Sequence, residues 1–183
     1  VSEGLRLGKI DYKWIPMSET SSEIGRAVIA AEDVNFCLHW GLEITAIKVA
    51  IKEGAKRGAS TITQQVVKNL FLWQGRSWLR KGIETLITPL IELLWPKKRI
   101  LEVYLNIVEF DEGVFGIEAA SKHYFGIEAK QIRAKQAALL AAMLPSPKSR
   151  SASNPSSFVK KRSNSIMDGA LTVEQDGRTS CFE

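Results

Sequence analysis

The sequence predicts an all-α protein built as one domain. Apolar residues recur with helical spacing in several windows of ten residues or more, and proline and glycine separate these windows. No strand-rich stretch and no internal repeat interrupts this pattern. The 183 residues are 45% hydrophobic, which is enough apolar material for a core of one domain.

The N-terminal part predicts an extended arm followed by two helices. Residues 1–20 are of mixed character and contain Pro16, which favours a short strand or an extended arm. Residues 24–33 follow a run of hydroxyl side chains suited to helix capping, and they are apolar nearly all round, as in a buried helix. Residues 46–56 predict a second helix with a basic stripe, which is usually a solvated face.

The rest of the chain predicts a series of further helices. Residues 82–95 form a very apolar window in which Pro89 should kink or constrain the helix, and Pro96 should end it. A glycine-punctuated loop is expected over 109–116, and a mobile polar tail over 173–183. The other helices are expected at 97–108, 116–126, 128–144 and 156–171.

The stretch 58–69 is the least ordinary in the chain. It should begin a helix near Ser60 or Thr61, so that unpaired N–H groups meet a row of polar side chains. Such a surface suits an anionic, oxygen-rich ligand, although a polar capped helix start with a solvated face is the alternative. The polar side chains of this stretch are Ser60, Thr61, Thr63, Gln64, Gln65, Lys68 and Asn69.

Two glutamates lie on otherwise apolar helix faces. Glu32 shares its stripe with Ile29 and Phe36, and Glu84 shares its stripe with Ile87 and Ile91. Burial of a charged carboxylate is costly, so the pKa of Glu32 should rise toward neutrality, as a general base requires. The alternative for Glu32 is a half-solvated side chain at a helix end.

Charge and aromatic content leave several partners open. The formal charge is +5 and the pI about 9.3, which favours an anionic partner such as nucleic acid, a phospholipid surface or a phosphorylated substrate. Residues 70–81 interleave Trp73 and Trp78 with basic side chains and could stack bases, rest in a bilayer interface or belong to the core. Cys37 and Cys181 form no CxxC motif, and the sequence does not decide whether they pair.

Five segments together resemble the motifs of glycosyltransferase family 51, the peptidoglycan glycosyltransferases. Residues 32–41 resemble its E-D-x-x-F-x-x-H-x-G motif, and residues 58–69 its G-x-S-T-I-T-Q-Q-x-x-K-N motif. The remaining three are similar to R-K-x-x-E, to K-x-x-I-L-E-x-Y-L-N and to the family's fifth motif; they lie at 80–84, 97–106 and 137–155. The five occur in the order of the family.

This resemblance implies an α-helical, lysozyme-like fold with a cleft that faces a membrane. The implied domain spans 21–172, after an N-terminal arm over 1–20 that would follow a membrane anchor in a longer native precursor. The short length resembles the monofunctional biosynthetic transglycosylases, which polymerise lipid II into β-1,4-linked glycan strands and release undecaprenyl pyrophosphate. The implied location is the periplasmic side of the bacterial inner membrane, with other cell-wall synthases as possible partners and no nucleic acid.

The resemblance also implies roles for individual residues. Glu32 would be the general base, in an inverting reaction, and Glu84 a second acid that organises cations or a divalent ion, Mg or Mn, at the pyrophosphate. Lys68, Arg80 and Lys81 would neutralise that pyrophosphate. Sugar and phosphate oxygens would be bound by Ser60, Thr61, Gln64, Gln65 and Asn69.

Departures and rival classes define what has to be tested. Asp111 stands where the family usually has Gly, so the loop could take another path there; Glu43 and Pro96 are lesser departures. A lysozyme-like hydrolase also uses carboxylates in a helical cleft, and the cation group argues against it. A basic nucleic-acid module or a catalytically inactive scaffold would not need Glu32.

Overall fold

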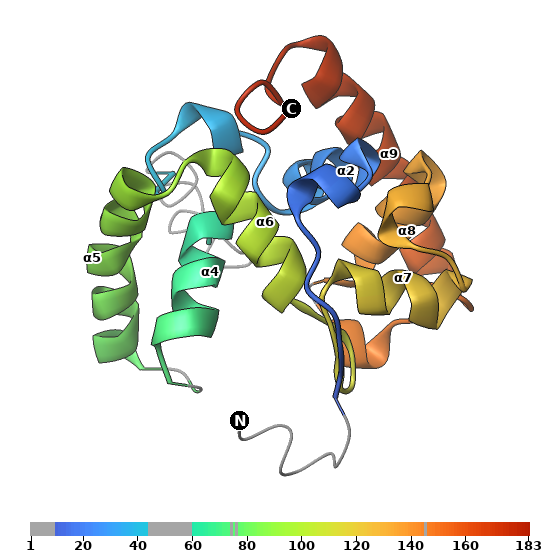
Figure 1. Ribbon diagram of the computed structural model, residues 1–183, viewed down its shortest axis with the longest axis horizontal. Coiled ribbons are helices and arrows are strands. Elements are labelled where there is room, and N and C mark those ends of the chain that lie inside the picture. The colour runs from blue at the N-terminus through green and yellow to red at the C-terminus, as the bar shows by residue number, and fades with distance from the viewer. Residues whose placement is uncertain (1–9, 44–59, 74, 76, 145) are drawn as a thin grey trace.

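The computed structural model describes residues 10–43, 60–73, 75, 77–144 and 146–183. Its helices form two packed groups (Figure 1). In one group α2 (Ser22–Glu32) packs against α8 (Ala134–Met143) and α9 (Ser157–Gln175). In the other, α4 (Ile62–Phe71) packs against α5 (Trp78–Leu94) and α6 (Lys97–Ile107). The all-α prediction is confirmed, and the predicted helix over 46–56 lies outside the described residues.

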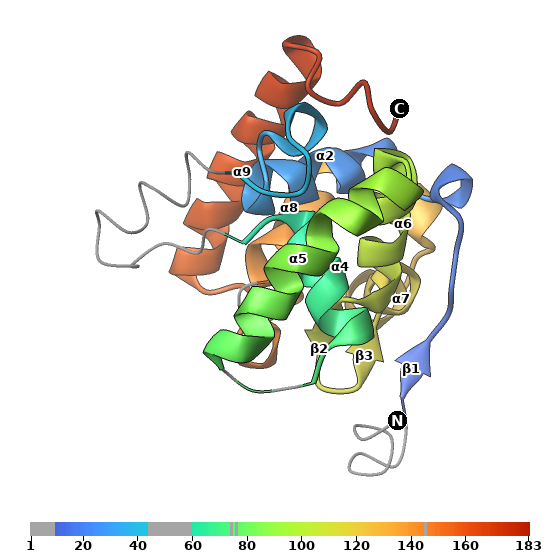
Figure 2. The same cartoon turned by 90° about the vertical axis from the view of Figure 1, so that its left-hand side faces the viewer.

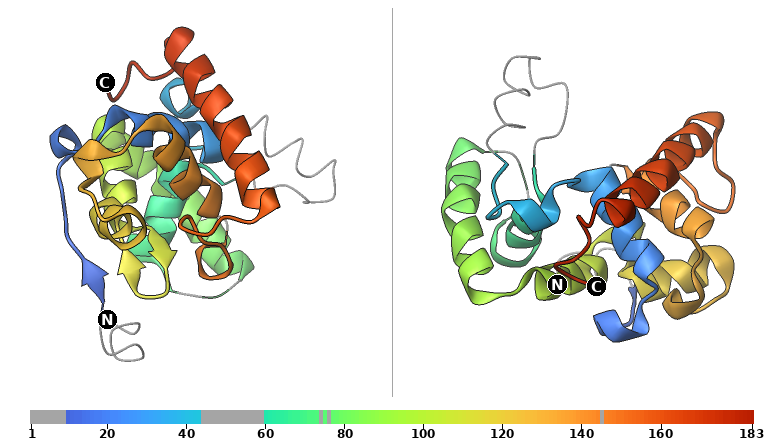
Figure 3. Two further views of the ribbon diagram at one scale, coloured as in Figure 1. Left: turned by 90° about the vertical axis from the view of Figure 1, so that its right-hand side faces the viewer. Right: turned by 90° about the horizontal axis from the view of Figure 1, so that it is seen from above.

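The two groups lie at opposite ends of the molecule. Seen from above, α5 lies at one end and α8 and α9 at the other, with α2 between them (Figure 3). Helix α7 (Ile117–Phe125) contacts α6 and lies below α2 in Figure 1. The end of α2 therefore meets the start of α4 where the two groups join, and this junction positions the site.

A small sheet lies beneath the helices. Its strands β1 (Asp11–Tyr12), β2 (Glu109–Asp111) and β3 (Val114–Phe115) are ordered β1-β3-β2, with β1 parallel and β2 antiparallel to β3 (Figure 2). The predicted loop over 109–116 is thus a hairpin, with Gly113 at φ 75°. Asp111 helps to hold the turn, because one carboxylate oxygen accepts the Glu112 N–H at 2.8 Å and the other accepts the Tyr124 hydroxyl at 2.8 Å.

Local capping explains where the predicted helix bounds are right. Thr61 caps α4 through a capping box with Gln64, Ser156 accepts the Val159 N–H at the start of α9, and Gly126 ends α7 in the left-handed region at φ 67°. Pro96 follows the end of α5 and precedes α6 directly. These positions confirm the predicted starts and stops.

Capping also explains where the prediction differs. Helix α5 begins at Trp78, because the Ser77 hydroxyl accepts the Arg80 N–H at 3.1 Å and starts the helix before Gly82. The predicted helix over 128–144 is divided into a 3₁₀ turn, η3 (Ala129–Gln131), and α8. Two glutamine side chains cause the division, since Gln131 and Gln136 each accept the backbone N–H three residues before them.

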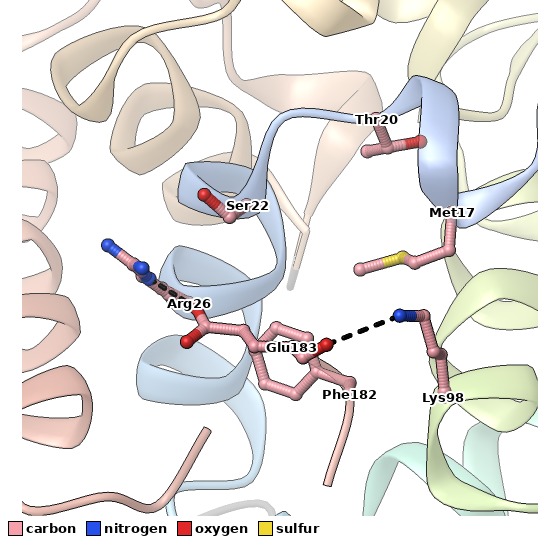
Figure 4. A pocket seen from close by; sticks show the side chains of 7 residues that line it. All are labelled: Met17, Thr20, Ser22, Arg26, Lys98, Phe182 and Glu183. Carbon is pink, nitrogen blue, oxygen red and sulfur yellow. Dashed lines mark hydrogen bonds and ion pairs between the residues drawn. The ribbon is translucent and has the colours of Figure 1, made fainter. Parts of the chain in front are cut away.

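The C-terminal tail folds back against α2 and the residues that follow it. Cys181 forms a disulfide with Cys37, which lies within the short 3₁₀ turn η2 (Phe36–Leu38), and Phe182 is buried. The Glu183 side chain pairs with Arg26 at 2.5 Å, and Lys98 donates to its backbone carbonyl at 3.4 Å (Figure 4). These contacts belong to the tail for which we predict mobility, and its motion stays a prediction.

No described helix combines the length and the apolar composition that a membrane crossing requires. The other two 3₁₀ turns are η1 (Met17–Glu19) and η4 (Pro147–Ser149).

Candidate active site

Glu32 is the last residue of α2, and its carboxylate is held in partly buried surroundings. The side chain is 14% exposed. Its Oε2 accepts a hydrogen bond from Gln65 Nε2, on α4, at 3.0 Å. Burial raises the pKa of Glu32, and the Gln65 hydrogen bond and the Arg162 and Lys68 charges oppose that rise. The predicted direction of the pKa shift is confirmed.

Gln65 is itself oriented from α6. The Tyr104 hydroxyl donates to Gln65 Oε1 at 3.4 Å, which directs the amide nitrogen of Gln65 toward Glu32. Tyr104 is fully buried, and burial together with the nearby acids holds its pKa well above the usual 10. The phenol therefore remains a hydrogen-bond donor at neutral pH.

Asp33 joins the end of α2 to the start of α4. Its Oδ2 accepts the Ile62 N–H at 2.9 Å, which satisfies one of the free donors at the N-terminus of α4. Its Oδ1 lies 2.8 Å from His39 Nε2, and His39 Nδ1 accepts the Gly41 N–H at 3.0 Å, so the imidazole proton is assigned to Nε2. The Thr61 hydroxyl then donates to the Gly41 carbonyl at 2.6 Å. The acid next to Glu32 thus fixes the backbone on both sides of the site.

The second acid lies in a group of cations at the start of α5. Glu84 is 2% exposed, and its two oxygens accept from Arg80 Nη1 at 3.0 Å and from Lys81 Nζ at 2.5 Å. Lys81 also donates to the Ser60 hydroxyl at 3.2 Å. The chain near the start of α4 is thereby joined to α5, and the cations are held in place by the acid.

Lys68 connects the two acids. It lies on α4, one turn after Gln65, and it interacts electrostatically with Glu84 and, more weakly, with Glu32. Burial lowers the pKa of Lys68, and the neighbouring cations Arg80 and Lys81 lower it further while the two acids oppose this. Together with the Gln65–Glu32 and Ser60–Lys81 hydrogen bonds, this places both acids and the cation group around the start of α4.

Two of the predicted ligand-binding residues make hydrogen bonds within the protein. Thr61 and Gln64 are buried and form the capping box of α4, so their hydrogen-bonding groups act within the protein. Asn69 is exposed on α4. Substrate binding by these three residues stays a prediction. The predicted residues that the structure brings together are Glu32, Ser60, Gln65, Lys68, Arg80, Lys81 and Glu84.

A further group of potential metal ligands is satisfied by hydrogen bonds. Ligand atoms of Asp33, His39 and Glu43 lie within 4.8 Å of one another. Both nitrogens of His39 and both oxygens of Asp33 are engaged, and Glu43 accepts from Asn35 at 2.6 Å. We interpret this group as a hydrogen-bonded support of the site.

Two residues near Glu32 were missed by the sequence analysis. Tyr104 lies within the helix expected at 97–108, and the available signal was a tyrosine hydroxyl that needs a partner when it is buried. Arg162 on α9 lies with Nη2 4.0 Å from Glu32 Oε1. It falls on the helix face of the buried residues Val159 and Ile166, where a cation is unusual.

These features define the class of protein. A partly buried acid facing a cation group, in a helical fold, suits an enzyme that transfers a group from an anionic leaving group. Residues 4–170 match the transglycosylase family, and the chain belongs to this family of glycosyltransferases.

Individual relatives carry a more specific name. The chain is 56% identical over 180 residues to the biosynthetic peptidoglycan transglycosylase of Jannaschia sp. (strain CCS1), covering 98% of this chain and 75% of that protein. The proteins of the same name from Pseudomonas fluorescens (strain SBW25) and Chromohalobacter salexigens are 53% and 54% identical, over 172 and 161 residues. Those matches cover 92% and 86% of this chain, and 72% and 69% of the relatives. The resemblance found in the motifs is confirmed.

Proposed function

We propose that the protein is a peptidoglycan glycosyltransferase that polymerises lipid II into β-1,4-linked glycan strands and releases undecaprenyl pyrophosphate. The names of the relatives support peptidoglycan synthesis as the activity. The observation that carries the proposal is the start of α4, where Gln65 donates to Glu32 at 3.0 Å and the preceding Ser60 accepts from Lys81 of the Glu84 group at 3.2 Å. A base and a cation cluster within reach of one substrate are what this transfer requires.

Glu32 is the general base of this reaction. It removes the proton of the acceptor's 4-hydroxyl as that oxygen forms a bond to the anomeric carbon of the donor sugar. Inversion follows, because the attack comes from the face opposite the leaving group. Gln65 occupies Oε2 of Glu32, so Oε1 is the oxygen on which the proton arrives.

The cation cluster receives the leaving group. When the bond from the anomeric carbon to the pyrophosphate oxygen breaks, its electron pair stays on the pyrophosphate, whose charge must be neutralised. Arg80, Lys81 and Lys68 supply three positive charges against the single charge of Glu84. A hydrolase acting on a neutral glycoside has no need of this excess of cations.

The residues around Glu84 do not fit a divalent cation. Both Glu84 oxygens are already paired with cationic side chains, and a metal ion there would be repelled by them. The reaction proposed here therefore uses only side chains of the protein. Binding of Mg or Mn at the pyrophosphate stays a prediction.

The outer face of α5 favours a membrane surface. Leu79, Leu86, Leu90 and Leu93 form one exposed stripe along the helix, and Trp78 at its start is 93% exposed. The substrate carries a polyprenyl chain, so a face of this kind beside the cation cluster would hold the enzyme at the bilayer.

The disulfide supports a location on the periplasmic side. A Cys37–Cys181 bond persists in oxidising compartments, in which the bacterial periplasm is included. Contacts with other cell-wall synthases would then occur at the same membrane.

The proposal is tested by glycan-chain formation from labelled lipid II. Loss of the base should lower the polymerisation rate of the Glu32→Gln enzyme by about 10²–10⁴-fold. Glu84→Gln should also lose activity, because the cations lose the acid that holds them. The matched control is Glu19→Gln, an exposed glutamate of η1 whose replacement should leave the rate unchanged.

Other outcomes would support the rival classes. Lysis of purified sacculi without polymer formation would indicate a hydrolase. Retention on DNA at physiological salt would indicate a nucleic-acid module. Full polymer yield from Glu32→Gln would end the proposed role of Glu32.

A further inference from the structure

Arg162 comes to the active site from the far end of the fold. It lies on α9, which packs against α2, and its side chain is 31% exposed. Glu32 ends α2, and Arg162 Nη2 lies 4.0 Å from Glu32 Oε1. A residue of the C-terminal helix thus faces the proposed base directly.

Arg162 places a positive charge near Glu32 but makes no hydrogen bond to it. A distance of 4.0 Å exceeds the 2.7–3.2 Å or so of an N–H to oxygen hydrogen bond. The two oxygens of Glu32 are therefore treated differently: Oε2 accepts from Gln65 at 3.0 Å, whereas Oε1 faces a guanidinium that does not bind it. An oxygen that must accept a proton from a substrate has to remain open in this way.

Arg162 itself has a buried hydrogen-bond donor that is not satisfied. Its Nε is buried and makes no hydrogen bond to any residue within the described part of the chain. Buried donors of native proteins are nearly always satisfied, so an orphaned one calls for an explanation. A side chain placed for packing or for stability would not be expected to leave such a donor unpaired.

The other charged groups around Glu32 have different tasks. Lys68, on α4, interacts more strongly with Glu84 than with Glu32, and it lies where the pyrophosphate would draw it away. Asp33, next in the chain, is an acid and opposes the ionisation of Glu32. Gln65 and Tyr104, from α4 and α6, are neutral. Among the described residues, Arg162 is the cation whose charge is directed at Glu32.

We propose that Arg162 is a positioning residue of the active site, which holds the Glu32 carboxylate ionised by its charge while leaving Oε1 open to the acceptor hydroxyl. The inference rests on the proposed role of Glu32 as the base. It adds a residue outside the five sequence motifs, and it assigns to α9 a part in catalysis as well as in packing.

The direct test is the titration of Glu32 in the absence of substrate. The side-chain carboxyl carbon of Glu32 would be followed by ¹³C NMR, with Glu32→Gln used to assign its signal. Arg162→Met, which keeps much of the volume, should move the titration midpoint to higher pH. Arg162→Lys keeps the charge and should restore most of the original midpoint. Equal midpoints in wild type and Arg162→Met would overturn the inference.

Thermal unfolding distinguishes this role from a structural one. Below about pH 4, where Glu32 is protonated in the folded and the unfolded state, Arg162→Met only removes an unsatisfied buried donor, so its Tm there should equal or exceed that of the wild type. A lowered Tm with an unshifted Glu32 midpoint would show that Arg162 serves only the fold.

The pH profile of lipid II polymerisation links the titration to the reaction. The acidic limb of kcat/KM should move to higher pH in Arg162→Met, in step with the NMR midpoint. An acidic limb that stays in place while the midpoint moves would separate Arg162 from catalysis. If wild type forms no polymer, the proposed function fails, yet the NMR titration still decides whether Arg162 controls the ionisation of Glu32.

Discussion

At the scale of single residues, the ionised carboxylate of Glu32 lowers the free energy of unfolding. Burial raises its pKa in the folded protein, whereas the unfolded chain has the ordinary value. A carboxyl whose folded pKa is raised lowers the stability as pH rises through that pKa, and has no effect below the unfolded pKa. The site therefore keeps an ionised acid where a neutral side chain would be more stable.

Replacement of Glu32 by Gln should raise the stability while it removes activity. We expect the free energy of unfolding of Glu32→Gln to exceed that of wild type at pH 7, and the two to converge below about pH 4, where the acid is protonated in both states. Urea unfolding across this pH range measures the difference, and Glu19→Gln should follow the wild-type curve. A Glu32→Gln protein less stable than wild type at pH 7 would contradict this account.

Removal of the Tyr104 hydroxyl should weaken the support of the base. The bond from Tyr104 to Gln65 is long, 3.4 Å, so its contribution should be at the modest end of a net hydrogen bond, about 0.5–1.5 kcal/mol. Tyr104→Phe should then lower kcat/KM for lipid II by roughly two- to threefold, since 1.4 kcal/mol is a factor of ten. Tyr12→Phe, at an exposed tyrosine of β1, is the control and should have no effect. Unchanged kinetics in Tyr104→Phe would show that Gln65 is oriented without this hydroxyl.

Sequence reasoning finds residues whose chemistry conflicts with their local surroundings. Glu32 and Glu84 stand out as acids on apolar stripes, and Lys68 follows Gln65 by one helical turn. Arg162 is separated from Glu32 by 130 positions, and no local pattern shows that α9 returns to α2. Long-range packing is the information that the sequence alone did not supply.

At the scale of elements, the bounds of a helix were predictable from the sequence where a capping residue marks its first or last turn. Thr61, Gly126 and Ser156 mark such positions. The hairpin of β2 and β3 was missed because its strands are very short and one of them pairs with β1, about a hundred residues away in the chain. The separation of η3 from α8 depends on the side-chain caps of Gln131 and Gln136, which an Ala- and Leu-rich composition hides.

The exposed face of α5 predicts a membrane contact that can be weakened on its own. Trp78 is 93% and Leu86 75% exposed, so serine at both positions should leave the fold intact. The double variant loses two large apolar side chains, each of which contributes up to about 1.5–3 kcal/mol when buried, and its binding to anionic liposomes should fall at least tenfold. Co-sedimentation measures this binding, and Trp73→Ser should act in the same direction.

The control for this prediction lies on another helix. Leu171 is 50% exposed on α9, which belongs to the other helix group. Leu171→Ser should bind liposomes as the wild type does. Equal losses of liposome binding in Leu171→Ser and in the α5 variant would indicate non-specific hydrophobic binding. No loss of binding in either variant would contradict a membrane-binding role for the α5 face.

At the scale of the whole molecule, the two helix groups are held together at the site and by the tail. Asp33 and Gln65 connect α2 with α4 through hydrogen bonds on either side of the base. The disulfide links Cys181 to Cys37, which is 144 positions earlier in the chain. Cys37 follows Glu32 and Asp33 closely, so the bond attaches the tail next to the site. The site therefore does not depend on one connection, and the contacts at Asp33 and Gln65 hold Glu32 whether or not the tail is attached.

Loss of the disulfide should accordingly lower stability far more than it lowers activity. A cross-link that closes so long a segment restricts the unfolded chain, and such bonds typically contribute about 2–4 kcal/mol to the free energy of unfolding. For a chain of this size we expect the Tm of the Cys37→Ser/Cys181→Ser protein to fall by roughly 4–16 °C. Well below that Tm it should still polymerise lipid II, because the hydrogen bonds to Asp33 and Gln65 remain. Dithiothreitol should lower the Tm of wild type toward this value and leave the serine protein unaffected. A serine protein that is stable but inactive would show instead that the tail positions the loop after Glu32.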